Sequence, residues 1–210
     1  TKTVTAIAVM QLWEQGLVDL DAPANDSLRA YKLIPANASH RPATLRHLLT
    51  HTSGIPEVVY PSRILKPVFG ETVKVGRPVP SLAEFYRGRI RLVAEPGTRY
   101  TYSDDGFATL GQIVEDVSGE PFHSYLSEHV FEPLGMTGTD LLRSDRVRAR
   151  LATGYVLGSS GAKAVMDLEL VTAGGGAIFS TPRDMARYLA ALLGGGANEH
   201  GSLLKPETLA

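Results

Sequence analysis

The feature that most constrains this sequence is a run at residues 4–13 that is apolar nearly all round a helical wheel. A helix of this kind has no polar face to turn toward water, so we expect it to lie at the centre of the fold. Gly16 follows the run and can take the left-handed conformation with which many helices end. The sequence therefore predicts a buried central helix against which the rest of the chain packs.

Capping signals start the other helical patterns. Each pattern is preceded by a side chain that can accept a backbone N–H, or by a proline that needs no such bond, and these residues are Thr44, Ser81, Ser103, Pro121 and Thr181. Ser81 also has Glu84 three residues later, which makes a capping box. We expect the last of these helices to bury a stripe formed by Met185, Tyr188, Leu189 and Leu192.

Two segments between the helices have a different character. Residues 55–80 contain five prolines, which predicts a long irregular loop. Residues 152–157 and 163–168 read as two strands separated by a Gly-Ser-Ser-Gly turn, which predicts a β-hairpin. Strand signals are otherwise few, so we expect a mainly helical chain.

Composition removes several classes of function. The 210 residues suffice for one domain, and 21 Lys and Arg against 22 Asp and Glu leave a net charge of -1, with no basic surface for nucleic acid. No apolar run reaches the roughly 18 residues of a membrane-spanning helix. The absence of cysteine excludes disulfides and thiolate metal sites. Oligomeric state and compartment are left open.

Four motifs occur in a fixed order along the chain. They are Thr1-Lys2-Thr3 at the start of the apolar helix, the segment Leu45 to Gly54 with its Thr52-Ser53-Gly54 turn, Tyr100-Thr101-Tyr102-Ser103-Asp104, and Gly175-Gly176-Ala177 with the residues that follow. Taken together, they resemble the serine β-lactamase and penicillin-binding protein family, nearest its class C, carboxylesterase and D-aminopeptidase branch. The resemblance covers essentially the whole chain.

The resemblance implies an α+β fold in which helices flank an antiparallel sheet and a helical region is inserted. It also implies a Ser-x-x-Lys motif whose lysine is Lys2, so the nucleophilic serine is expected two residues before Thr1. The family's third motif, Lys-Thr-Gly or His-x-Gly, has no match after Tyr102. Residues 1–210 are therefore expected to be a partial, mostly helical domain that lacks the segments carrying the nucleophile and the third motif.

The implied function is hydrolysis of an ester, amide or β-lactam bond through an acyl-serine, without a cofactor. The substrate would be a small molecule or a peptide. Members of the family are often exported, so the resemblance implies a periplasmic or secreted protein, while the sequence leaves the compartment unknown and a cytoplasmic location open. The alternative is a non-catalytic homologue that binds penicillin-like or cell-wall ligands, or assembles with itself, without hydrolysing a substrate.

Lys2 and Tyr102 are the catalytic residues that the resemblance implies. A lysine accepts a proton only when neutral, and with an ordinary pKa near 10.4 this requires a pKa about three units lower. Tyr102 would relay the proton between serine, leaving group and water. The non-catalytic alternatives are that the Lys2 ammonium group is simply solvated and that Tyr102 is a packed tyrosine whose hydroxyl has a hydrogen-bond partner. We expect Tyr100 to fill this structural role.

Asp104 is the expected substrate-binding residue and departs from the family's commoner Tyr-x-Asn pattern. An asparagine can donate an N–H to a substrate carbonyl, whereas an ionised aspartate only accepts. Asp104 should hold Lys2 protonated, which favours Tyr102 as the base and ester or peptide substrates over lactams. Its position equally suits a simple acidic residue at a helix N-terminus.

Other signals are weaker. His47 and His51 are four residues apart but lack a third ligand, so no metal site is predicted. Ser160-Gly161-Ala162-Lys163 repeats the Ser-x-x-Lys spacing within the expected turn, and Lys74-Val75-Gly76 resembles the third motif but precedes Tyr102. We interpret both as chance matches. The glycines at 174–176 indicate a close approach of two backbone segments, without a catalytic role.

Overall fold

The structure is a computed structural model that describes residues 1–57, 70–159 and 161–209. The elements in these residues are α1 (Lys2–Glu14), α2 (Ala24–Ser27), β1 (Lys32–Ile34), α3 (Leu45–Leu49), β2 (Thr72–Lys74), α4 (Leu82–Phe85), β3 (Arg89–Arg91), α5 (Asp104–Ser118), α6 (Phe122–Leu126), the π-helical turn η3 (Ser127–Phe131), α7 (Asp145–Arg148), β4 (Tyr155–Gly158), β5 (Gly161–Ala164), β6 (Leu168–Leu170), α8 (Ala173–Gly176), α9 (Pro182–Leu193) and α10 (Pro206–Leu209).

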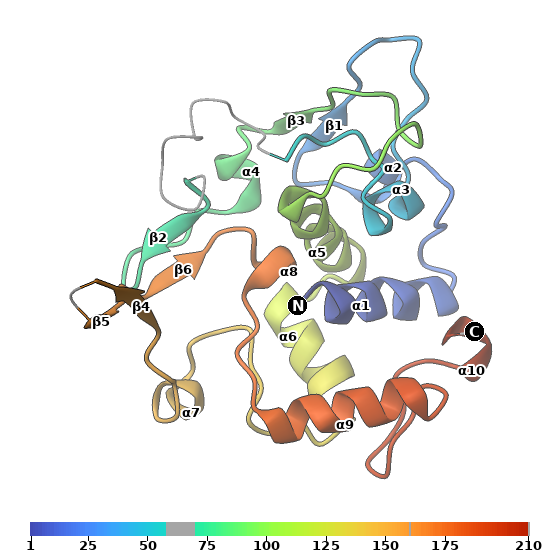
Figure 1. Ribbon diagram of the computed structural model, residues 1–210. Helices are drawn as coiled ribbons and strands as arrows, with labels where there is room; N and C mark the ends of the chain where they lie inside the picture. Colours follow the sequence, from blue (N-terminus) through green and yellow to red (C-terminus); the bar gives the residue numbers. More distant parts are fainter. Residues whose placement is uncertain (58–69, 160, 210) are drawn as a thin grey trace.

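Helix α1 lies at the centre of the fold, as its sequence predicts. It contacts α5, α6, η3 and α8, and it runs between α5 and α9 in Figure 1. Five of its apolar side chains are almost fully buried, namely Val4, Ile7, Ala8, Val9 and Leu12. Ala6 and Met10 are half-buried, and Trp13 is exposed near the end of the helix. Gly16 adopts a φ of 70° just beyond the helix end, which confirms its predicted role.

The predicted caps are also confirmed. Thr44, Ser81, Ser103 and Thr181 each accept a hydrogen bond from the backbone N–H three residues later. Ser81 and Glu84 complete a capping box. Pro121 precedes α6 as its N-cap, and the apolar side chains that follow it are buried. The helix starts were therefore set by local sequence.

The strands form three two-stranded sheets. β1 pairs with β3 in parallel, with Leu33 opposite Ile90, and β2 pairs with β6 antiparallel, with Val73 opposite Glu169. Strand β2 lies within the predicted irregular loop, so that prediction was wrong for residues 72–74; residues 58–69 lie outside the described residues. Three-residue strands of this kind carry too short an alternation to be read from sequence.

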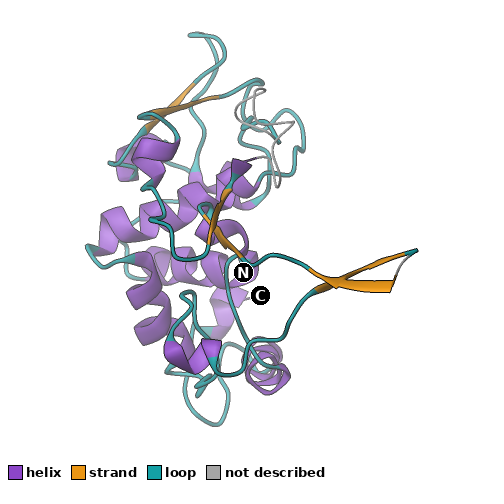
Figure 2. Cartoon of the chain, turned by 90° about the vertical axis from the view of Figure 1, so that its left-hand side faces the viewer, coloured by secondary structure: helices purple, strands orange, loops and turns teal. Residues whose placement is uncertain are grey.

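The third sheet is a β-hairpin where the sequence predicts one, but its strands are Tyr155–Gly158 and Gly161–Ala164 and not 152–157 and 163–168. β4 and β5 pair antiparallel, with Tyr155 opposite Ala164. Every residue of both strands is exposed, and Figure 2 shows the pair projecting from the helical body. Lys163 lies on this exposed arm and Ser160 lies outside the described residues. Lys74, in the other chance match, ends β2 and is also exposed.

Helix α9 is rotated relative to its prediction. Its buried residues are Asp184, Tyr188 and Ala191, whereas Met185 and Leu189 of the expected stripe are exposed. The physical reason is Asp184, whose Oδ2 accepts hydrogen bonds from the Gly138 N–H (2.7 Å) and from the Thr139 hydroxyl (2.9 Å). A carboxylate that is buried with such partners fixes which face of the helix points inward.

The whole is a mixed α+β arrangement of helices with small sheets, and most of the buried apolar residues belong to one cluster around α1 and α5. No helix among the described residues has the length and hydropathy needed to cross a membrane.

Candidate functional site

Lys2 stands at the first position of α1, with Thr1 as the N-cap. Its ammonium group forms an ion pair with Asp104 Oδ1 and donates a hydrogen bond to the Gly175 carbonyl at 2.7 Å. It also lies 4.8 Å from the centroid of the Tyr102 ring. The structure thus brings the predicted residues Lys2, Tyr102 and Asp104 together from segments about a hundred residues apart.

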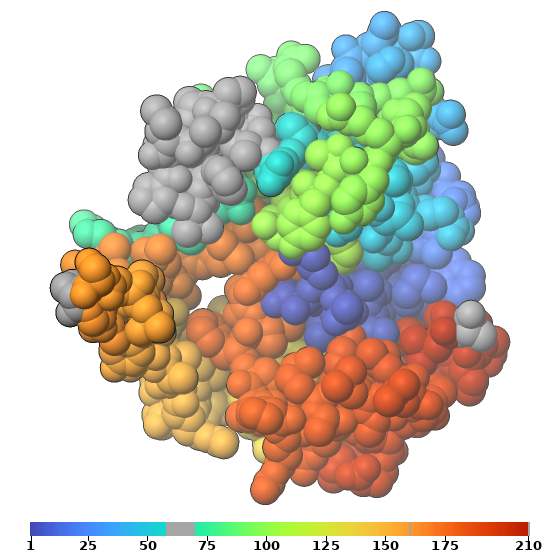
Figure 3. Space-filling model, viewed as in Figure 1, coloured from blue at the N-terminus to red at the C-terminus, as the bar shows by residue number. Residues whose placement is uncertain are grey.

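Tyr102 has an accessible side chain beside this ion pair. It is 45% exposed, and its hydroxyl lies 3.4 Å from Asp104 Oδ1 in a geometry for donation. Tyr100 is 67% exposed, so the expectation that it packs into the core was wrong. Figure 3 shows the first residues of the chain at the surface beneath the green segment that carries these tyrosines.

Asp104 begins helix α5, directly after the Ser103 cap. A carboxylate at this position is stabilised by the N-terminal end of the helix dipole. The same carboxylate also holds Lys2 and is approached by the Tyr102 hydroxyl. Asp104 is therefore both an acidic residue at a helix N-terminus and the ion-pair partner of Lys2.

The pKa of Lys2 lies above its ordinary value, contrary to the shift that a neutral lysine base requires. Burial lowers this pKa, but the hydrogen bonds and charges of Asp104 and Tyr102 together raise it by more. The Lys2 side chain is 19% exposed, so solvent only partly screens the ion pair. The site therefore keeps Lys2 as an ammonium ion, as expected from an aspartate at position 104.

Helix α8 supplies a partner that the sequence did not assign. The Gly175 carbonyl accepts from Lys2, the Gly174 carbonyl accepts from the Thr5 hydroxyl at 2.8 Å, and α8 packs on α5. A Cβ atom on Gly174 would lie 2.5 Å from the Phe107 carbonyl oxygen, so only glycine fits there. The glycine run thus marks a close backbone approach, as predicted.

The two histidines of the second motif hold backbone groups. His47 Nδ1 accepts from the Thr44 N–H at 3.2 Å, and His51 Nδ1 accepts from the Ser103 N–H at 3.2 Å. Across residues 1–57, 70–159 and 161–209, the one group of three potential metal ligands within 4.8 Å of one another is Glu120, Glu128 and His129. It contains neither His47 nor His51.

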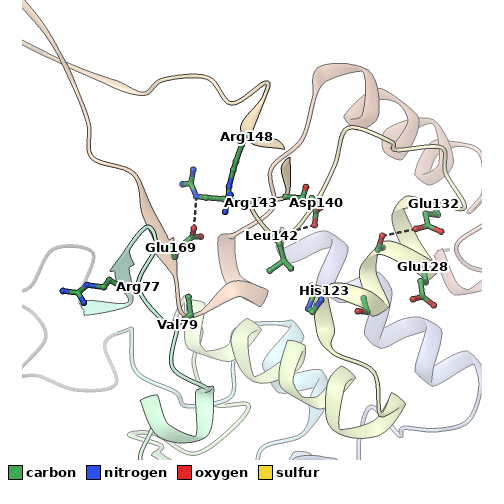
Figure 4. Close-up of a pocket in the computed structure, with 14 residues that line it drawn as sticks. Arg77, Val79, His123, Glu128, Glu132, Asp140, Leu142, Arg143, Arg148 and Glu169 are labelled. Atoms are coloured by element: carbon green, nitrogen blue, oxygen red, sulfur yellow. Dashed lines mark hydrogen bonds and ion pairs between the residues drawn. The ribbon is translucent and has the colours of Figure 1, made fainter. Parts of the chain in front are cut away.

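A cavity of about 580 Å³ lies apart from the lysine cluster. Figure 4 shows residues of β6, α6 and the segment before α7 around it. Its wall contains Arg143, which pairs with Glu169 at 3.1 Å and stacks on Phe179. Lys2, Tyr102 and Asp104 do not line this cavity. The candidate catalytic groups are therefore those of the lysine cluster.

The sequence and the structure are both similar to known proteins. The D-alanyl-D-alanine-carboxypeptidase/endopeptidase AmpH of Escherichia coli is 29% identical over 90% of this chain and 46% of its own length. The monacolin J acid methylbutanoyltransferase of Aspergillus terreus is 31% identical over 100% of this chain and 54% of its own. The chain thus spans about half the length of these relatives.

Among solved structures, the octameric penicillin-binding protein homologue from Pyrococcus abyssi superposes with a TM-score of 0.73 at 30% identity. The similarity covers 99% of this chain and 46% of that one. The fold of residues 1–210 is accordingly that of the β-lactamase and penicillin-binding proteins, as the resemblance implied. The family model described as Beta-lactamase matches residues 1–210 in full, and the chain belongs to that family.

Proposed function

We propose that residues 1–210 are part of a serine hydrolase domain that forms an acyl-serine intermediate. The observation that carries the proposal is the cluster of Lys2, Tyr102 and Asp104 at the first turn of the central helix. A serine two residues before Thr1 lies three positions from Lys2, and residues with this spacing share one face of a helix. The nucleophile then stands beside the two groups that can handle its proton.

Tyr102 is the base in this proposal, because Lys2 is held as an ammonium ion and has no free lone pair. As a phenolate paired with that ammonium, Tyr102 takes the serine proton while the serine oxygen bonds to the carbonyl carbon. When the tetrahedral intermediate collapses, Tyr102 returns the proton to the leaving alcohol or amine. Water then gives a proton to Tyr102, attacks the acyl group and releases the serine, which regains that proton. General acid-base transfer of this kind contributes about 10²–10⁴-fold.

Ester and peptide substrates fit this site better than β-lactams. The Lys2–Asp104 pair is neutral overall, so it offers less attraction to a substrate carboxylate than a lysine beside an asparagine would. Asp104 can accept a hydrogen bond from a substrate N–H but has no amide to donate to a carbonyl. The names of the peptidase and acyltransferase relatives are consistent with this choice.

The test uses the full-length protein with a fluorophosphonate probe, followed by intact mass and peptide mapping. We expect one adduct on the serine two residues before Thr1 and about 10²-fold slower labelling in Tyr102→Phe. Tyr100→Phe is the matched control, since that exposed tyrosine has no contact with Lys2 or Asp104 among the interactions described. If the folded wild-type protein is not labelled by the probe, the proposal of a serine hydrolase is wrong, and a non-catalytic role in ligand binding or assembly is favoured.

A further inference from the structure

His51 follows helix α3 with an unusual backbone conformation. Its φ is 57°, in the left-handed region where histidine, asparagine and aspartate are the commoner residues after glycine. The Thr52 N–H donates to the His47 carbonyl at 2.8 Å, which closes the turn around it. The turn brings the His51 side chain against the segment that carries Tyr102.

This one residue holds the backbone on both sides of Tyr102. The His51 carbonyl accepts from the Thr101 N–H at 2.8 Å, and its Nδ1 accepts from the Ser103 N–H at 3.2 Å. Its ring lies 4.7 Å from the Tyr102 ring at an interplanar angle of 32°, and 5.1 Å from the Phe107 ring. Tyr102 is therefore fixed by two hydrogen bonds and one ring contact from His51.

The bond to Ser103 also sets the protonation of the imidazole. A backbone N–H can only donate, so Nδ1 must carry a lone pair and the ring proton of neutral His51 lies on Nε2. Within the described residues, the charged and titratable groups that face this ring are Lys2 from α1 and Tyr100, Tyr102 and Asp104 from the segment leading into α5. Burial and the Lys2 charge lower the pKa of His51, and Asp104 offsets part of this shift.

We infer that His51 is a positioning residue that holds Tyr102, and the start of the helix that carries Asp104, in the geometry needed for proton transfer. The inference rests on the proposed role of Tyr102. Protonation of Nδ1 would make the His51 ring and the Ser103 amide both hydrogen-bond donors, so the bond between them would be lost. It would also place a second positive charge near Lys2. Activity is therefore lost at acid pH, as His51 becomes protonated.

Two substitutions separate the contributions of His51. His51→Asn keeps an acceptor oxygen close to the position of Nδ1 and tolerates the left-handed backbone, but it has no ring and does not titrate. His51→Phe keeps a ring and loses the acceptor. His47→Asn is the matched control, because the hydrogen bonds that the His47 side chain makes in the described part of the chain go to Thr44, and the His47 carbonyl that closes the turn is kept in the variant.

The experiment measures kcat and KM of the full-length protein with a p-nitrophenyl ester from pH 4.5 to 8, together with the melting temperature and the hydrogen exchange of the Ser103 amide. We expect His51→Phe to lower kcat about tenfold or more with KM changed less than about threefold, and to speed exchange at Ser103. His51→Asn should recover kcat to within a few-fold. Both variants should lose the part of the acid limb that follows protonation of His51, so that activity persists to lower pH, whereas His47→Asn should keep the wild-type limb.

Unchanged kcat and Ser103 exchange in His51→Phe would overturn the inference. So would losses in both His51 variants that simply follow the melting temperature, as a purely structural role requires. A wild-type protein that forms no acyl-enzyme, while Ser103 exchange still depends on His51, would instead overturn the proposed function and leave the positioning of Tyr102 standing.

Discussion

At the scale of single residues, the charge state of Lys2 depends on two neighbouring side chains, Asp104 and Tyr102, of which Asp104 carries the opposite charge. Asp104 offers a carboxylate to the ammonium group, and the resulting ion pair raises the pKa of Lys2 even though burial acts in the opposite direction. A lysine whose pKa is raised by folding stabilises the folded state at every pH below its unfolded value. That stabilisation is lost as pH rises through the folded pKa.

We therefore expect Asp104→Asn to destabilise the full-length protein at pH 7 to 9. The difference in unfolding free energy between wild type and variant should shrink above about pH 10.5, as Lys2 loses its proton. Urea unfolding at intervals from pH 7 to 11 measures this difference. Asp145→Asn is the control, because Asp145 is fully exposed and its ion pair with Arg148 is long, at 3.8 Å. A difference that grows above pH 10.5 would contradict the assignment.

At the scale of elements, the site depends on how closely α8 approaches α5. The glycines of α8 let its backbone pass against the Phe107 carbonyl and present the Gly175 carbonyl to Lys2. A side chain at Gly174 cannot be accommodated by rotating a neighbour, since the atom it would meet belongs to the backbone of α5. The separation of the two helices must increase instead.

Gly174→Ala should therefore lower the unfolding free energy by about 1–3 kcal/mol, the usual cost of overpacking. Gly176→Ala is the matched comparison, because a Cβ there meets only the end of the Leu170 side chain, at 3.1 Å, which can move. Denaturant titrations of both variants measure the two costs. Equal effects of the two substitutions would show that the contact with α5 is not limiting.

The buried carboxylate of Asp184 determines which face of α9 packs against the core. Removing it in Asp184→Ala leaves the Gly138 N–H without its acceptor, and we expect a loss of about 1–3 kcal/mol. Asp145→Ala, which removes an exposed aspartate from α7, should change stability by less than about 0.5 kcal/mol. Thermal and urea unfolding give both values, and a stable Asp184→Ala variant would contradict this account of the helix orientation.

At the scale of the whole molecule, the apolar residues divide into a core around α1 and α5 and a set left at the surface. Leu110 in α5 has no exposed area, whereas Leu157 in the projecting hairpin is 83% exposed. Burial of apolar area is the main stabilising contribution in a fold of this size, so two leucines in these settings should differ greatly in their effect.

Leu110→Ala should cost about 2–5 kcal/mol, as expected for a buried leucine. Leu157→Ala should change the unfolding free energy by less than about 0.5 kcal/mol. Urea unfolding of the full-length variants distinguishes the two cases. A large loss in Leu157→Ala would show that another part of the protein or a partner packs on the hairpin.

The sequence by itself determined the features that depend on local interactions. The apolar run defines α1, and Thr44, Ser81, Ser103 and Thr181 start their helices because a capping bond spans only three residues. The motif order also gave the family and pointed to Lys2, Tyr102 and Asp104. The catalytic and substrate-binding roles of these three residues stay predictions.

Tertiary structure decided what depends on residues far apart in the chain. The pKa of Lys2 follows from an aspartate 102 positions away, the inward face of α9 follows from a contact of Asp184 with Gly138, and β2 exists only because β6 pairs with it. The role of His51 at Ser103 belongs to the same class. Charge interactions and hydrogen bonds act through space over a few ångströms, and the sequence does not record those distances.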